Sequence, residues 1–426
     1  MKTSNNFLNP LQIAYIIGRT HYLPLGGVGM HDFRVFRGKL DGQSLQKSLR
    51  ILVEKHVALR TMIDGGSFTQ TILEKNDTNF TEIDFSNLTP EEAELKTNQL
   101  IELYSHHVHD LTNSPWHIWL IQLPECSHYS WKSILLTSFD ALILDGYAIS
   151  IILEELFYHY NNITYSVHKE INSLTKINKT QPSKINIYEN NIEDETFWKN
   201  KIKTMGNTVS FPWKKDLESI NSSRYNRRTA TIDKQCWDKL SLIAAKQPLL
   251  PNSLLNGIIF DSLSNLTNNT PLYVAIPISL SLYQDCLSNH STVIPIIYDQ
   301  TENKSLFNRV SKIQSDTFEA LEHISFSGIE IARLICDQIK TSVPFPIVLT
   351  NGLSWRLPPH EDYINYYSGQ TQTPQIAMDI RLTFSHNKDL VIDIDYATEA
   401  IELAVIDSLL ISIKNSIESI CQNYLS

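Results

Sequence analysis

Residues 138–150 read SFDALILDGYAIS, in which two aspartates, Asp140 and Asp145, bracket four mostly apolar residues. The run before them, YSWKSILLTSF, has the apolar content of a buried strand, and the run after them, GYAISIILEELFYHYNN, has apolar residues at helical spacing. This stretch therefore predicts a strand, a loop and a helix in succession. A buried acid needs a partner or a chemical role, so at least one aspartate should be explained by the fold or by the function.

Working outward, the rest of the chain shows the same mixture of predicted helices and strands. The predicted helices cover residues 44–63, 236–245, 250–266, 305–321 and 399–424, and the further predicted strands cover residues 114–123 and 271–280. No short repeat of the solenoid kind is present. The pattern predicts an α/β protein whose lobes each contain a mixed sheet.

The length of 426 residues favours two lobes, because a single core rarely grows beyond roughly 250 to 300 residues. Composition becomes polar and loses its apolar period near residue 166. We therefore expect an N-terminal lobe over residues 1–170, a linker over residues 171–194 and a C-terminal lobe over residues 195–426.

Composition narrows the possible partners and locations. Hydrophobic residues make up 42% of the chain and charged residues 19%, which is enough apolar material for globular cores. The net charge of −10 carries no basic block, so nucleic acid and anionic membranes are not expected as partners. The five scattered cysteines form no CxxC pair, and no apolar run is long enough to span a membrane. We expect a cytoplasmic protein.

Two motifs could suggest a metal site or a phosphate-binding site, but neither predicts one. The run SHHVHD, residues 105–110, could suggest a metal cluster, but adjacent histidines point in different directions, and a polar helix end is the simpler interpretation. The run LGGVGMHD, residues 25–32, lacks a phosphate-binding glycine pattern, so its glycines are expected to permit a tight backbone path. No GxSxG elbow, HExxH helix or kinase signature is present.

Three runs in the first half nevertheless carry a resemblance. NPLQIAYIIGR (residues 9–19), LGGVGMHDFRVFRG (25–38) and DALILDGYAIS (140–150) resemble, in this order, the heterocyclisation domains of nonribosomal peptide synthetases, a branch of the condensation-domain superfamily. In the second half, LLPNSLLNGIIFDSL, HISFSGIEIARLI, FPIVLTNGL and GQTQTPQIAMD are similar to further motifs of that family. The resemblance covers residues 8–420.

The residues around the two aspartates distinguish between two branches of the condensation-domain superfamily. Ordinary condensation domains carry HHxxxDG with an essential second histidine, and that position is Ala141 here. Alanine transfers no proton, so a mechanism that needs this histidine is excluded. The cyclising branch has DxxxxDxxS, which Asp140 and Asp145 match, although its serine position is Ala148 and a serine, Ser150, stands two residues later. Residues 281–284 and 291–299 also depart from the family pattern.

The resemblance implies a V-shaped pair of lobes, similar to chloramphenicol acetyltransferase, with a tunnel between them. It implies condensation of an acyl group on an upstream carrier protein with Cys, Ser or Thr on a downstream carrier. Cyclodehydration to a thiazoline or oxazoline would follow. Such steps belong to the assembly of siderophores and other secondary metabolites. The partners are carrier proteins or synthetase modules, whose phosphopantetheine arms bring the substrates. No cofactor or metal bound by the chain itself is implied, and we expect a monomer that is either free-standing or part of a larger assembly line.

The resemblance also assigns candidate residues. Thr350 and Asp379 match the residues that serve cyclodehydration in the family, and Asp379 stands between apolar neighbours that could raise its pKa by desolvation. Asp140, Asp145 and Gly146 are interpreted as structural residues at the tunnel, Asp145 as a helix cap and Asp140 as a brace against a basic side chain. The alternative is that the two aspartates are an acid/base pair. The candidates for the lining of the substrate path are Gln375, Ser150 and His31.

Three other functions remain as alternatives. A condensation-only enzyme would form the amide without losing water, which the altered residues 281–284 permit. A non-catalytic member would act as a scaffold for carrier proteins, and an occluded tunnel would favour it. An acyltransferase that uses free coenzyme A would need the histidine that Ala141 replaces, so it ranks last.

Overall fold

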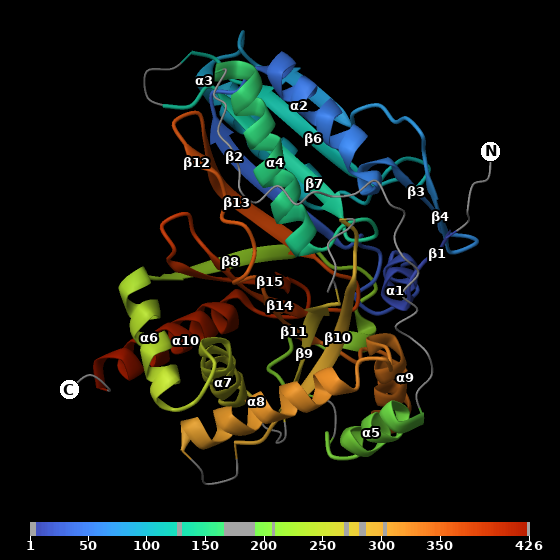
Figure 1. Ribbon diagram of the computed structural model, residues 1–426, viewed down its shortest axis with the longest axis vertical. Coiled ribbons are helices and arrows are strands. Elements are labelled where there is room, and N and C mark those ends of the chain that lie inside the picture. Colours follow the sequence, from blue (N-terminus) through green and yellow to red (C-terminus); the bar gives the residue numbers. More distant parts are fainter. Residues whose placement is uncertain are drawn as a thin grey trace.

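The computed structural model describes residues 6–125, 130–165, 192–206, 209–267, 272–280, 287–300 and 305–423. These residues form two lobes, one above the other in Figure 1, and each lobe contains a six-stranded sheet with helices against it. The sheets have the strand orders β12-β13-β2-β7-β6-β5 and β10-β9-β11-β14-β15-β8. The predicted division into two α/β lobes is therefore present in the fold.

The first lobe is built from the N-terminal half of the chain. Its elements are β1 (Asn6–Phe7), α1 (Pro10–Gly18), β2 (His31–Gly38), α2 (Gly42–Lys55), β3 (Thr61–Asp64), β4 (Thr69–Ile72), β5 (Phe80–Asp84), α3 (Pro90–Ser105), β6 (Trp116–Gln122), β7 (Ser133–Asp140) and α4 (Gly146–Tyr165). A 3-10 helix spans Val57–Arg60. The strands β1, β4 and β3 form a small separate sheet.

Alternate residues of the first sheet supply two separate cores. Phe36 and Leu135 belong to the core that faces α2 and α4, whereas Val35 and Ile134 belong to the core that faces α3. This follows from the strand period of two, which sends neighbouring side chains to opposite faces. The sheet is consequently covered on both faces, as Figure 1 shows for α2 and α4 on the viewer's side.

The second lobe has one larger core. Its elements are α5 (Ile192–Ile202), a 3-10 helix (Leu217–Ser219), β8 (Tyr225–Ile232), α6 (Lys234–Lys246), α7 (Pro251–Ser264), β9 (Leu272–Ser279), β10 (Ser291–Tyr298), α8 (Leu306–Glu322), α9 (Gly328–Ile339), β11 (Ile347–Asn351), β14 (Met378–Phe384), β15 (Leu390–Ala397) and α10 (Leu403–Asn423). Among the family-like motifs, HISFSGIEIARLI contains a capping box, because Ser327 and Glu330 each bond the other's backbone N–H at the start of α9.

Two strands cross from the second half of the chain into the first lobe. β12 (His360–Glu361) and β13 (Ile364–Gln372) pair in the first sheet, where β13 runs antiparallel to β2 from Ile364↔Gly38 to Gln372↔His31. The sheets therefore do not follow the predicted boundaries at residues 1–170 and 195–426. Most of the predicted linker, residues 171–194, lies outside the described residues, and its last residues already belong to α5.

The predicted elements agree with the structure except near residue 56 and at the last helix, which was predicted from residue 399 but begins at Leu403. The helix predicted over residues 44–63 ends at Lys55 and is followed by the 3-10 helix and by β3. His56 is buried and extended, and its Nε2 lies 2.7 Å from Glu155 Oε2 of α4. This tertiary contact turns the chain, which periodicity alone does not reveal.

Within the described part of the chain, no helix combines the length and the apolar content needed to cross a bilayer.

Candidate functional site

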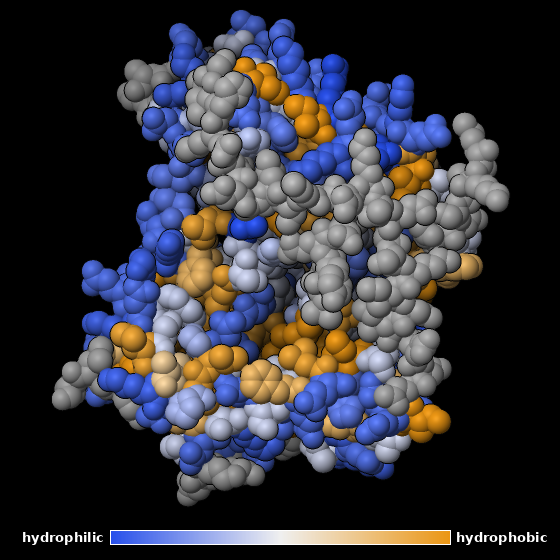
Figure 2. Space-filling view, viewed as in Figure 1, coloured by the Kyte–Doolittle hydropathy of each residue, from blue (hydrophilic) through white to orange (hydrophobic). Residues whose placement is uncertain are grey.

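Three adjoining cavities lie where the two lobes meet. The α1 cavity, of about 130 Å³, is lined by α1, α9, β9, β10 and β11, and the α4 cavity, of about 110 Å³, is lined by the start of α4 and the loop after β7. Both are lined by Tyr15, Thr350 and Asp379. A third cavity of about 340 Å³, the arginine cavity, shares Trp355 and Arg381 with the α4 cavity. Figure 2 shows hydrophobic residues gathered beneath the largely hydrophilic upper lobe.

Thr350 and Asp379 meet at the boundary between the α1 and α4 cavities. They stand on the parallel neighbours β11 and β14, where Val348 is paired with Asp379. The Thr350 hydroxyl donates a hydrogen bond of 2.8 Å to Asp379 Oδ1. The structure thus brings together the two residues that the sequence singled out for proton transfer.

Asp379 is only 6% exposed, and its environment opposes ionisation. Burial raises its pKa to about 6, and the negative charge of Asp395 acts in the same direction. The guanidinium of Arg381 and the hydrogen bond from Thr350 oppose this rise without cancelling it. A carboxyl with this pKa can both accept and donate a proton near neutral pH.

A largely buried cluster of charged residues lies beside Asp379. Arg381 Nη2 donates to Asp32 Oδ2 at 2.8 Å, which joins β14 of the second lobe to β2 of the first. Arg34 Nε donates to Asp32 Oδ1 at 2.6 Å. Arg227 on β8 bonds Asp393 and Asp395 of β15, and the cluster comprises Asp32, Arg34, Arg227, Arg381, Asp393 and Asp395. Its three cations balance its three anions, so an ionised Asp379 would add an uncompensated negative charge.

Asp140 is fully buried at the end of β7 and forms an ion pair with Arg19, the residue after α1. Its Oδ1 accepts the backbone N–H of Leu142 at 2.9 Å, which holds the loop. Burial raises the pKa of Asp140, and Arg19 opposes that rise. Arg19 is the basic partner that the sequence could not identify, and neither cavity shared by Thr350 and Asp379 has Asp140 in its lining.

Asp145 caps α4 and also reaches the second lobe. Its Oδ1 accepts the N–H of Ala148 at 2.9 Å, as expected of an N-terminal cap, and its Oδ2 lies 3.4 Å from Ser279 Oγ and from the backbone N of His290. Burial raises the pKa of Asp145, and these backbone hydrogen bonds oppose the rise. Asp145 lines the α4 cavity, and its position at a tunnel stays a prediction.

The comparisons with known proteins identify the family. The sequence matches the family model of the Condensation domain over residues 33–426. This chain belongs to the condensation-domain family. The condensation-domain chain is 24% identical over 425 residues to bacitracin synthase 1 of Bacillus licheniformis, a match over 94% of the chain and 8% of that protein. It is 19% identical over 404 residues to the pyochelin synthetase PchF of Pseudomonas aeruginosa, a match over 88% of the chain and 21% of PchF.

Solved structures show the same fold. The EpoB cyclization-docking bidomain from Sorangium cellulosum superposes with a TM-score of 0.84 at 20% identity, covering 99% of this condensation-domain chain and 86% of the bidomain. The X-domain from teicoplanin biosynthesis superposes with a TM-score of 0.74 at 15% identity, covering 99% and 96%. These matches confirm the predicted pair of acetyltransferase-like lobes. The chain spans less than a quarter of the length of the two synthetases.

The three residues suggested for the lining of the substrate path have different positions. Gln375 lines the α1 cavity, and its side chain donates to Ser342 O at 3.0 Å. Ser150 is buried, and its hydroxyl accepts the N–H of Arg356 at 3.1 Å. His31 is fully buried between Ser138 and the carbonyl of Ser105, and burial lowers its pKa to about 4. Ser150 and His31 therefore connect elements and do not line the α1 or α4 cavity.

Sequence reasoning missed Tyr15 and the charged cluster of this condensation domain. Tyr15 lies inside the quoted run NPLQIAYIIGR, yet the spacing of α1 gives no sign that the residue lines both inner cavities. A signal for the cluster was present in β14, where Asp379 and Arg381 alternate with Met378, Ile380 and Leu382. Polar residues at a period of two in an otherwise buried strand indicate a polar face.

The close packing of Gly146 gives a first testable prediction. A Cβ at Gly146 would lie 2.4 Å from the ring of Trp355, which lines the α4 cavity. Gly146→Ala should therefore displace Trp355 and lower the free energy of unfolding by about 1–3 kcal/mol in urea denaturation. The control Gly65→Ala places its Cβ at an ordinary 3.4 Å from Ile16. Equal stabilities of the two variants would contradict the packing argument.

Asp379 gives a second prediction, on stability against pH. Its pKa in the folded state, about 6, lies above the ordinary 3.8, so the folded protein binds the extra proton between these values. The contribution of Asp379 to stability therefore falls as pH rises from about 4 to about 6 and stays low above that. Asp379→Asn should gain up to about 3 kcal/mol relative to wild type between pH 4 and pH 8. Urea denaturation of both proteins at the two pH values measures this gain, and a pH-independent difference would count against the raised pKa.

Proposed function

We propose that this chain is a heterocyclisation enzyme: it joins a carrier-bound acyl group to carrier-bound Cys, Ser or Thr and then closes a thiazoline or oxazoline ring. The observation that carries the proposal is the hydrogen-bonded pair Thr350 and Asp379 at the boundary of two cavities, with the pKa of Asp379 raised to about 6 by burial. Ala141, at the position of the catalytic histidine of ordinary condensation domains, speaks against chemistry that depends on that histidine.

Amide formation requires mainly positioning. The amine of the acceptor attacks the thioester carbonyl of the donor, the C–N bond forms, and the thiol of the upstream arm leaves with a proton. This step is downhill, so two arms that meet in one passage gain rate through effective molarity. In this proposal the adjoining α1, α4 and arginine cavities are parts of such a passage between the lobes.

Cyclodehydration requires proton transfer. The side-chain thiol or hydroxyl of the acceptor adds to the new amide carbonyl, losing its proton to a base while the carbonyl oxygen gains one. The C–OH bond then breaks, the nitrogen loses its proton, the C=N bond forms and water leaves. An acid whose pKa is close to neutral can serve both the acceptance and the donation. In this proposal Asp379 transfers these protons, and Thr350 fixes one of its carboxyl oxygens.

The partners in this proposal are an upstream and a downstream carrier protein or synthetase module. The phosphopantetheine arms arrive on these partners, so the chain itself needs no bound cofactor or metal. Support for this comes from the kinds of protein that resemble the chain: PchF is a pyochelin synthetase and EpoB is described as a cyclization-docking bidomain. The proposal places the protein in the cytoplasm as a monomer.

Intact-protein mass spectrometry tests the proposal. A downstream carrier loaded with cysteine is incubated with an acyl-loaded upstream carrier and the protein, and the masses of both carriers are followed. Acyl transfer followed by loss of one water supports heterocyclisation. Transfer without loss of water would replace the proposal by the condensation-only alternative. An absence of transfer across several carriers and with serine or threonine in place of cysteine would favour the scaffold alternative.

A further inference from the structure

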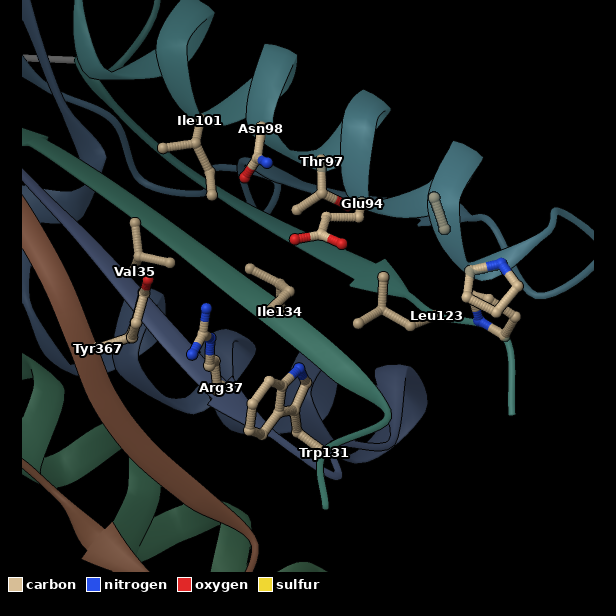
Figure 3. Close-up of a pocket in the computed structure, with 13 residues that line it drawn as sticks. Val35, Arg37, Glu94, Thr97, Asn98, Ile101, Leu123, Trp131, Ile134 and Tyr367 are labelled. Atoms are coloured by element: carbon tan, nitrogen blue, oxygen red, sulfur yellow. The ribbon is translucent and has the colours of Figure 1, made fainter. Parts of the chain in front are cut away.

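A fourth cavity lies on the opposite face of the first sheet from α2 and α4. It is formed between α3 and the strands β2, β7 and β13, and its volume is about 80 Å³ (Figure 3). Its walls include the buried side chains of Val35, Ala93 and Ile134. None of the candidate residues at the lobe interface lines it, so it is separate from the three cavities between the lobes.

Arg37 is held in this cavity by two aromatic rings. Its guanidinium lies 4.5 Å from the ring centre of Trp131 and 3.3 Å from that of Tyr367. Stacked rings cover the faces of a guanidinium and leave its edge N–H groups available to a planar anion. Within the described residues, Arg37 has no carboxylate at ion-pair distance, although it lines a largely apolar cavity.

Thr97 provides an independent sign of a ligand. The residue is only 6% exposed, and its hydroxyl has no hydrogen-bond partner among the residues that the structure describes. Thr97 follows Ala93 by one helical turn, so both face the sheet, and Figure 3 shows Thr97 above the cavity. A buried hydroxyl without a partner is unfavourable, and an oxygen-bearing ligand in so small a cavity would satisfy it.

We propose that this cavity binds a small apolar carboxylate, with the carboxylate on the edge of Arg37, the Thr97 hydroxyl as a further donor and the aliphatic chain against Val35 and Ile134. Figure 3 shows Glu94 and Thr97 on the helix side and Arg37 on the strand side, so one carboxylate oxygen would face Arg37 and the other Thr97, while the negative charge of Glu94 opposes binding. A cavity of roughly 150 Å³ can hold benzene, so a volume of about 80 Å³ encloses a carboxylate and roughly two or three carbons, and the end of a longer chain would extend through the open side of the cavity.

A bound carboxylate would connect parts that are distant in sequence. Arg37 belongs to β2, Thr97 to α3, and Tyr367 to β13, the strand that crosses from the second half of the chain. The ligand would therefore join α3 to the crossover strand and add to the stability of the first sheet. The site needs no activity in the tunnel, so its test is independent of the proposed heterocyclisation.

Methyl nuclear magnetic resonance on the whole chain tests the proposal. Isoleucine methyl groups are labelled, the Ile134 signal is assigned with Ile134→Val, and the protein is titrated with hexanoate, 1-hexanol and hexylammonium. We expect hexanoate to shift the Ile134 signal at concentrations roughly tenfold or more below those needed for the two other probes, because a charge-assisted hydrogen bond contributes at least that factor. No shift with hexanoate, or equal responses to all three probes, would overturn the proposal.

Two variants locate the binding determinants. Arg37→Leu should weaken hexanoate binding roughly ten- to a hundredfold, while hexanol binding changes little. Thr97→Val, which keeps the shape and removes the hydroxyl, should weaken hexanoate binding several-fold. The matched control Arg50→Leu removes an exposed arginine from α2 and should leave binding unchanged. Unchanged hexanoate binding by a folded Arg37→Leu protein would contradict the assignment.

Discussion

Replacing Asp379 by asparagine is expected to abolish the loss of water while leaving acyl transfer largely intact. The amide keeps the size of the side chain and can still accept a hydrogen bond from Thr350, but it cannot exchange a proton with the substrate. General acid–base catalysis contributes typically 10²–10⁴-fold, so the cyclised product should fall by about that factor. Mass spectrometry of the downstream carrier measures both steps in one experiment, because the uncyclised amide retains the mass of one water.

Two further variants test whether the loss of ring closure is due to the missing acid at position 379. Thr350→Val should slow ring closure less than Asp379→Asn, because it removes the hydrogen bond that fixes the acid and leaves the acid itself in place. Asp407→Asn is the matched control, since Asp407 is an exposed acid paired with Arg228 on the surface. Ring closure by Asp379→Asn at the wild-type rate would remove Asp379 from the chemistry, and simultaneous loss of both steps would indicate a structural role.

The second large effect is expected from Arg19→Met. Asp140 is completely buried, and Arg19 is its cationic partner. Removing one member of a buried ion pair leaves an uncompensated charge, so the variant should lose about 3–5 kcal/mol of stability near neutral pH. The loss should become smaller in acid, because Asp140, whose pKa burial already raises, then becomes neutral. Urea denaturation at pH 8 and pH 5 measures both effects.

The double variant Arg19→Met/Asp140→Asn separates charge from packing. Asparagine can keep the hydrogen bond with the N–H of Leu142 without leaving a buried charge, so the double variant should recover most of the lost stability. If it is as unstable as Arg19→Met alone, the effect comes from lost side-chain packing or from the bond between Arg19 and the carbonyl of His109.

The sequence predicted the local features of the site better than its tertiary ones. The strand, loop and helix around Asp140 and Asp145 follow from hydrophobic periodicity, and the cap formed by Asp145 follows from its position before a helix. The family resemblance selected Thr350 and Asp379, and the apolar neighbours of Asp379 predicted its desolvation. Their catalytic role and those of the other assigned residues stay predictions.

The features that the sequence did not reveal depend on long-range pairing. Arg19 and Asp140 are 121 positions apart, and Arg381 and Asp32 are 349 apart. Periodicity describes which face a side chain occupies but not which strand or helix lies opposite it. The same reason explains His31, which was a candidate for the lining of the substrate path, whereas β2 directs it into the interior toward Ser138.

The crossing of β13 into the first sheet has a consequence for biosynthesis. During translation, β2 and β7 can pair as soon as the first half of the chain has left the ribosome, but the other edge of β2 has no partner until residues 364–372 have been made. An exposed strand edge is a template for pairing with other chains. The nascent first lobe is thus at risk of aggregation for most of its synthesis, and a fragment that ends before β13 should need a chaperone or a supplied strand to stay in solution.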